Sequence, residues 1–172
     1  MTEIRTPRLL LRRWHPDDDL GPLAEIQADP VVMQHIGDGE PRSLDESAED
    51  IERWEEEWDD EGFGVFAVEL LGSGELAGAV GLYVPDAPPQ VAGHIGIQWR
   101  LARVFWGQGY ASEAAQATLE FALQDRGIDR VVAVTAQGDT SSPKVLDKLG
   151  MTFTGEADGN RLYAIDLTEY EG

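Results

Sequence analysis

The feature that most constrains the fold is a long helical segment that leads into a short apolar strand. Residues 112–126 are rich in alanine, and Gly127 is placed to end the helix as a left-handed cap. Residues 131–135 form an apolar run typical of a strand buried inside a sheet. We therefore expect a sheet with a buried interior strand, and helices that pack on it.

Turn, capping and periodicity signals place the other elements around this pair. Strands are predicted over 8–14, 63–70, 75–84, 91–101, 151–155 and 161–167, with a glycine-containing hairpin turn at 71–74. Helices are predicted from Pro16, over 44–60 behind a capping box of Ser43 and Glu46, and behind Ser142 as N-cap, with a short element at 31–36. No repeat or linker interrupts the series, so residues 1–172 are predicted to form one domain with a mixed sheet.

The net negative charge of the chain excludes nucleic acid as a partner, and two explanations of that charge stay open. Asp and Glu number 33 against 13 Lys and Arg, a net charge of -20, and only two of the bases are lysines, Lys144 and Lys148. Nucleic acid is excluded as a partner because phosphate contacts need a basic face. An acidic surface can steer a cationic substrate, or it can keep a protein solvated in high salt. The acids are spread along the whole chain, which favours the salt explanation.

The residue types and segments that the sequence lacks limit the cellular compartment and the kinds of catalytic or metal site that we expect. There is no cysteine, so disulfides, thiolate metal sites and a cysteine nucleophile are excluded, and the three histidines are too far apart in sequence to favour a metal site. No apolar run approaches the ~20 residues of a membrane helix, and the first residues do not form a signal peptide. A cytoplasmic protein without membrane contact is the expectation.

A turn with two glycines precedes the long helix. Gly107 and Gly109 follow the predicted strand 91–101, and such a turn directs free backbone N–H groups and the positive end of the helix dipole at one point. That arrangement suits a phosphate, although an ordinary tight turn explains the glycines equally well. The spacing matches neither a Walker A loop nor a dinucleotide fingerprint.

The residues around this turn carry a more specific signal. The run 94–101 followed by 103–114, the segment 8–12 with Trp14, the segment 29–33 and the late segment 145–151 together resemble the GNAT superfamily of N-acetyltransferases, in particular its RimJ/RimL-type branch. The resemblance extends over nearly the whole chain. It implies an α/β GNAT fold, with a mixed, mostly antiparallel sheet, splayed strands and flanking helices, and acetyl-CoA as cosubstrate.

The resemblance also assigns roles to single residues. The family's phosphate-binding signature falls on Trp106, Gly109 and Ala111, and the amides from Gly107 to Ser112 would bind the pyrophosphate. The full set implied to bind acetyl-CoA is Gln98, Trp99, Leu101, Trp106, Gly107, Gln108, Gly109, Tyr110, Ala111, Ser112 and Asp139. Among these, Gln98, Trp99 and Leu101 lie on the strand that would splay and pair with the pantetheine chain, and Asp139 with Ser142 would approach the pantetheine arm.

Two positions depart from the family pattern, and the residues that act as general acid and general base are not assigned. Asp139 stands where the family has asparagine, and an ionised carboxylate only accepts hydrogen bonds. Leu146 stands where many members have a tyrosine that acts as general acid. His94 is a candidate base, or it fills a strand position. Ser142 is a candidate catalytic residue, or it only caps its helix. His35 is expected in a surface loop, with the acceptor cleft as the alternative.

The function predicted from the sequence is the transfer of an acetyl group from acetyl-CoA to a primary amine through a tetrahedral intermediate. The amine could be a protein N-terminus or a small molecule, and a homodimer is consistent with the superfamily. Two alternatives remain at this point. The chain could be an acyl-CoA-binding module without catalysis, or an interaction domain that docks a basic partner on the acidic helix 44–60.

The salt explanation predicts a melting temperature that rises with salt. Repulsion among the acids is screened as the Debye length falls from about 10 Å at 0.1 M to about 3 Å at 1 M. Calorimetric melting in increasing KCl measures this directly. A melting temperature that stays flat would contradict the salt explanation.

Overall fold

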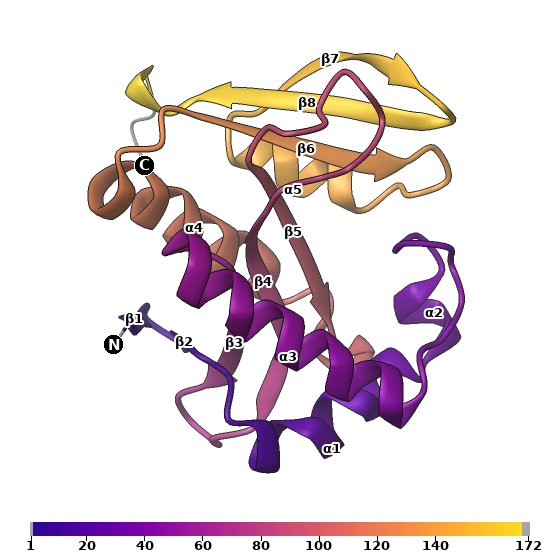
Figure 1. The fold of residues 1–172 in the computed structure, drawn as a ribbon, viewed down its shortest axis with the longest axis vertical. Coiled ribbons are helices and arrows are strands. Elements are labelled where there is room, and N and C mark those ends of the chain that lie inside the picture. The colour runs from indigo at the N-terminus through magenta and orange to yellow at the C-terminus, as the bar shows by residue number, and fades with distance from the viewer. Residues whose placement is uncertain (1, 170–172) are drawn as a thin grey trace.

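One sheet of eight strands organises the molecule in the computed structural model, which describes residues 2–169 (Figure 1). The strands are β1 (Ile4–Arg5), β2 (Leu9–Arg12), β3 (Val65–Leu70), β4 (Leu76–Tyr83), β5 (Gly96–Leu101), β6 (Arg130–Ala136), β7 (Thr152–Ala157) and β8 (Asn160–Asp166). The helices are α1 (Pro16–Gln27), α2 (Pro30–Met33), α3 (Leu44–Glu61), α4 (Tyr110–Arg126) and α5 (Ser142–Lys148), with 3₁₀ turns at Arg103–Phe105 and Leu167–Glu169. The predicted α/β class with a mixed, mostly antiparallel sheet is confirmed.

The sheet divides into two parts at its single parallel contact. The strand order is β1-β2-β3-β4-β5-β6-β8-β7, and all neighbours are antiparallel except β5 and β6. These two strands pair at Gly96 and Val132 and then separate. In Figure 1, β6, β8 and β7 run across the view while β3, β4 and β5 run down it. The separation leaves one backbone edge of β5 without a strand partner among the described residues.

Helices cover both faces of the first part of the sheet. Alternate residues of β3 and β4 point to opposite faces. Val65, Ala67 and Ala79 pack with Trp54 of α3 and Leu23 of α1. Their neighbours in sequence, including Phe66 and Val80, belong to the larger core that α4 and α5 complete. The apolar run at 131–135 lies in β6 with Val131–Ala133 buried, as predicted for an interior strand.

The capping box predicted at the start of α3 is confirmed. The Ser43 hydroxyl accepts from the Glu46 N–H at 3.1 Å, and the Glu46 carboxylate accepts from the Ser43 N–H at 2.9 Å. On the apolar face of α3, Ile51, Trp54 and Trp58 are buried, as their spacing predicted. The Trp58 indole N–H donates to the Val65 carbonyl at 2.9 Å, which joins α3 to the sheet.

Some predicted boundaries were wrong. The strand predicted over 91–101 covers only 96–101, because residues 91–94 form turns closed by N–H groups of Val91, Gly93 and His94. The helix predicted from residue 112 begins at Tyr110, directly after Gly109. Ser142 lies inside α5 rather than capping it, since the N-cap position is Ser141. Among residues 2–169, no helix is long and apolar enough to cross a bilayer.

A buried ion pair joins β2 to the start of α1. Arg12 donates to both oxygens of Asp19, at 2.8 and 2.9 Å, and also to Glu69 at 3.1 Å. Burial by itself would raise the pKa of Asp19, but the hydrogen bonds from Arg12 and from the His15 N–H outweigh it and hold this pKa below its ordinary value. Removal of one partner from such a pair leaves a buried charge without compensation.

We therefore expect Asp19→Asn to lower the free energy of unfolding by about 3 kcal/mol at neutral pH. Because the folded-state pKa is depressed, this stabilisation is present above the unfolded pKa of about 3.9 and is lost as pH falls through the folded-state pKa. Urea unfolding at pH 7 and pH 3 checks both points. Asp17→Asn, at an exposed acid of the same helical turn, is the control, and an equal cost for both variants would contradict the assignment.

Candidate active site

A cavity of about 600 Å³ opens at the end of β5. Its walls come from the end of β5, the turn before α4, the loop before α5 and the segment after α2. Nine of the residues predicted to bind acetyl-CoA line it: Trp99, Leu101, Trp106, Gly107, Gly109, Tyr110, Ala111, Ser112 and Asp139. The fold therefore brings together, in one cavity, residues that lie up to 40 positions apart in sequence.

The glycine turn has the backbone geometry of an anion site. Gly107 and Gly109 have φ of 76° and 83°, a region that residues with a Cβ rarely adopt, and Gly109 is the N-cap of α4. The first turn of a helix has N–H groups without intrahelical acceptors, and here they face the cavity at the positive end of the helix dipole. The Trp106 indole N–H donates to the Leu101 carbonyl at 2.9 Å and fixes the turn against the end of β5.

Arg8 and Glu113 hold this turn from the other side. Arg8 Nη1 donates to the Gln108 carbonyl at 2.8 Å, its Nε donates to Glu113 at 2.7 Å, and its guanidinium lies 4.2 Å from the centre of the Tyr110 ring. Burial would raise the pKa of Glu113, but hydrogen bonds from Thr6 and Arg8 lower it. Glu113 therefore stays ionised and anchors the start of α4 to the β1–β2 hairpin.

Both lysines of the chain line the same cavity. Lys144 and Lys148 lie on α5, one turn apart, and face the space in front of the glycine turn. In a protein with a net charge of -20, this is a local concentration of positive charge. Lysine provides a point charge for phosphate, in addition to the amides of the turn.

A second cavity, of about 540 Å³, adjoins the first. The residues that line both include His35, Trp99, Arg100, Asp139 and Ser142. Thr135 of β6 also lines the second cavity, and its buried hydroxyl has no hydrogen-bond partner in the described part of the chain. The two cavities meet at the edge of β5, so a group held in one can reach a group held in the other.

Asp139 caps the start of α5 in place of Ser142. One carboxylate oxygen accepts from the N–H groups of Ser141 and Ser142, both at 3.0 Å, and the other accepts from the Ser142 hydroxyl at 2.6 Å. Burial would raise the pKa of Asp139, but these hydrogen bonds lower it below its ordinary value. A carboxylate that only accepts is therefore suited to this position. The Ser142 proton is directed at Asp139, which leaves the hydroxyl oxygen as an acceptor.

Three predicted site residues do not line the first cavity. His94 is exposed in the turns before β5 and lines neither cavity, because the strand that was to carry it begins two residues later. Gln98 points to the opposite face of β5 and accepts from Arg100 at 2.9 Å, so it lines only the second of the two cavities. Gln108 lies in the turn but outside the cavity lining, and its carbonyl is bound by Arg8.

Other positions were missed or left open by the sequence. Leu146 is fully buried in the core, so the place of the family's tyrosine is taken by a packing residue. His35 lines both cavities, and its ring lies so close to Gly138 that a Cβ there would be 3.3 Å from its Cε1. Nothing in the local sequence around His35 or Arg100 indicates this placement, since each reaches the cleft through contacts distant in sequence.

The comparison with known families decides the identity of the fold. Residues 8–152 match the model of the acetyltransferase (GNAT) domain. The chain belongs to the GNAT acetyltransferase family. It is therefore an acyltransferase, and the predicted fold and enzyme class are confirmed.

Individual relatives agree with this membership. The chain is 29% identical to the uncharacterized protein YkkB of Bacillus subtilis (strain 168) over 156 residues, which covers 89% of this chain and 87% of YkkB. The crystal structure of a GNAT-family acetyltransferase from Bacillus anthracis superposes with a TM-score of 0.80 at 25% identity, over 98% of this chain and 100% of that one. RimL, a ribosomal L7/L12 alpha-N-protein acetyltransferase solved with coenzyme A, superposes with a TM-score of 0.76 at 17% identity, over 96% and 98% of the two chains, which shows a shared fold.

Proposed function

We propose that this GNAT protein transfers an acetyl group from acetyl-CoA to a primary amine by direct attack on the thioester. The observation that carries the proposal is the convergence of the glycine turn, the first turn of α4 and both lysines on one cavity. A pyrophosphate needs N–H donors and positive charge in one place, and these residues supply both. We further propose that the protein is of the RimJ/RimL type, a branch whose fold it shares in RimL.

The chemistry requires alignment, a donor for the oxyanion and a route for one proton. The amine nitrogen forms a bond to the thioester carbonyl carbon, and the carbonyl oxygen takes the negative charge. The unpaired backbone edge of β5 near Trp99 and Leu101 is the proposed source of N–H donors for that oxygen. The C–S bond then breaks, and the thiolate takes a proton to leave as CoA.

Ser142 is proposed to contact the pantetheine arm as an acceptor rather than as a proton donor. Its own proton is held by Asp139 at 2.6 Å, and Asp139 stays ionised because its pKa is lowered. A pantetheine amide N–H can therefore donate to the Ser142 oxygen. The proton donor to the thiolate is not assigned to Leu146, whose side chain is apolar and buried.

The alternative of an interaction domain has weaker support. Within the chain, Glu55 and Asp59 of α3 pair with Arg13 at 2.7 and 3.0 Å, and the buried Asp50 pairs with Arg42 at 2.6 Å. The exposed Glu49, Glu52 and Glu56 form no ion pair among residues 2–169. This face therefore offers charge to a basic partner, but a solvated acidic helix face explains it as well. Homodimerisation and the cytoplasmic location stay predictions.

Gly109→Trp is expected to weaken acetyl-CoA binding about 100-fold or more, because the indole would displace phosphate from charge-assisted hydrogen bonds at the start of α4. Isothermal titration with acetyl-CoA in high salt measures this. Gly127→Trp is the matched control, since Gly127 ends the same helix with φ of 64° and has open space around it. The wild type should bind saturably, and absence of binding by the wild type would refute the proposed function.

His35 is proposed to take a proton from the ammonium group of the acceptor, so that the neutral amine can attack, because His35 lines both cavities. We expect His35→Gln to lower kcat about 100-fold at neutral pH, with a smaller defect at alkaline pH, where the amine is deprotonated in solution. The assay is thiol release from acetyl-CoA with a panel of amines. His94→Gln is the control and should match the wild type, and equal rates for His35→Gln and wild type at every pH would exclude His35 as the base.

A further inference from the structure

Arg100 of β5 lies where three cavities meet. It lines the two cavities of the site and a third of about 660 Å³ between β5, α3 and the loop after α2. Ile97, Trp99 and Leu101 point to the α4 side of the sheet, so Arg100, in the alternate register, points to the α3 side. The side chain therefore stands beside the place where an acceptor would approach the edge of β5.

The guanidinium of Arg100 has amide partners but no ion pair in the described chain. It donates to Gln27 Oε1 at 2.8 Å and to Gln98 Oε1 at 2.9 Å, and it lies 5.5 Å from the centre of the Trp54 ring. None of the ion pairs found among residues 2–169 includes it. Burial lowers the pKa of Arg100 to about 10, so the group is still charged at neutral pH. Arg100 is half-buried, and an arginine withdrawn from water in this way is normally paired with a carboxylate.

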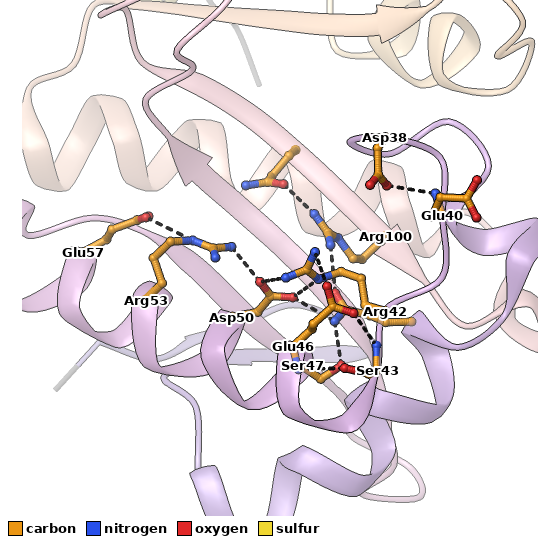
Figure 2. Close-up of polar contacts among 12 residues, drawn as sticks. Asp38, Glu40, Arg42, Ser43, Glu46, Ser47, Asp50, Arg53, Glu57 and Arg100 are labelled. Carbon is orange, nitrogen blue, oxygen red and sulfur yellow. Dashed lines mark hydrogen bonds and ion pairs between the residues drawn. The ribbon is translucent and has the colours of Figure 1, made fainter.

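The nearest buried carboxylate is already committed to other partners. Asp50 of α3 accepts from Arg42 at 2.6 and 2.9 Å, and pairs with Arg53 at 2.9 Å, as Figure 2 shows. Gln27 Nε2 donates to Asp50 at 3.0 Å and to Ser47 at 2.9 Å. These bonds fix the Gln27 amide with its oxygen toward Arg100.

The cluster therefore holds three guanidinium groups around one carboxylate. Glu46 and Glu57 reach Arg42 and Arg53 only at 3.8 Å each, and neither pairs with Arg100. Asp38, Glu40, Glu57 and Asp86 also line the third cavity, so it is not basic as a whole. Of its three guanidinium groups, however, only that of Arg100 has no carboxylate partner among residues 2–169. A guanidinium matches a carboxylate in shape and charge and binds it through two parallel hydrogen bonds.

We propose that Arg100 binds a carboxylate of the acceptor, so that the acceptor is a primary amine that also bears a carboxylate. The inference rests on the proposed function and names the substrate class for that same site. The cost of removing the guanidinium from water is incurred on folding, so a bound carboxylate adds an ion pair without that cost. Asp38 and Asp86 line the third cavity as exposed acids and offer attraction to the ammonium end of such a molecule.

The charge of the whole protein does not prevent this recognition. Its net charge of -20 repels anions at long range, but salt screens that field beyond about 8 Å at physiological ionic strength. A contact inside a cavity is screened far less. Arg100 therefore selects a carboxylate at short range, whereas the surface acids act on the molecule only as it approaches.

The test compares amines that differ only in the carboxylate. Acetyl-CoA is supplied with amino acids and their carboxamides, and with short peptides whose second residue is Asp or Asn, so that free amino acids and peptide N-termini are distinguished. We expect kcat/KM for the carboxylate member of the accepted pair to exceed that of its amide by on the order of 10- to 100-fold. Arg100→Gln should remove this preference, mainly through KM, and Arg100→Lys should restore part of it.

Arg126→Gln is the matched control, because it removes the same charge from an arginine that donates to the Gly62 carbonyl and lines none of the three cavities. It should retain the preference for carboxylates. Melting temperature and acetyl-CoA titration show that each variant is folded and binds the donor.

The possible outcomes distinguish a failure of the carboxylate inference from a failure of the proposed acetyltransferase function. If the wild type binds no acetyl-CoA, the proposed function fails and the inference fails with it. If it binds acetyl-CoA and acetylates the carboxamide members as fast as the carboxylate members, or acetylates only the carboxamide members, the function stands and the inference is overturned. If it binds acetyl-CoA but acetylates no amine, both the function and the inference are overturned. If Arg100→Gln keeps the preference, Arg100 is only a structural residue.

Discussion

The separation of β5 from β6 is the constraint on which the rest of the molecule depends. Adjacent strands of a sheet normally exchange hydrogen bonds along their length, but these two pair only at Gly96 and Val132. The second cavity lies between the separated strands, since residues of both β5 and β6 line it, and it adjoins the first cavity at the end of β5. Helix α4 begins after the end of β5, so its first N–H groups open on the same space. The proposed donor and acceptor sites are adjacent because β5 and β6 separate.

Positive charge is concentrated in the first cavity of an otherwise acidic protein. The chain has a net charge of -20, yet Arg100 and both lysines line this cavity. Two acids beside it are held by structural partners: Glu113 by Arg8, and Asp139 by the start of α5. The exposed Asp38 and Asp86 line the second cavity instead. In the proposed function, the phosphates of acetyl-CoA would therefore meet positive charge inside a protein whose surface would otherwise repel them.

Local signals in the sequence predicted most elements well and failed where the backbone turns. The capping box at Ser43 and the spacing of Trp54 and Trp58 depend on contacts within one helix, so the sequence determined them. The start of β5 was wrong because the turns over 91–94 depend on Pro85 and Pro88 carbonyls. Because β5 begins after His94, this histidine lies outside the cavities in which a catalytic base was expected. The capping role of Asp139 was missed because the cap was expected at Ser142, whereas the carboxylate three residues earlier accepts from the first N–H groups of α5.

The sequence by itself determined the family, the order of the elements and the glycine turn before α4. The turn was predictable because Gly107 and Gly109 adopt a positive φ, which glycine reaches more readily than other residues. What only the tertiary structure decided is the placement of His35 and Arg100, on which the proposed acceptor site rests. His35 enters the cleft because the loop after α2 lies against Gly138, and Arg100 is left without a carboxylate because Asp50 is bound by Arg42 and Arg53. Such placement depends on which distant segments pack together, and that information lies in no local pattern.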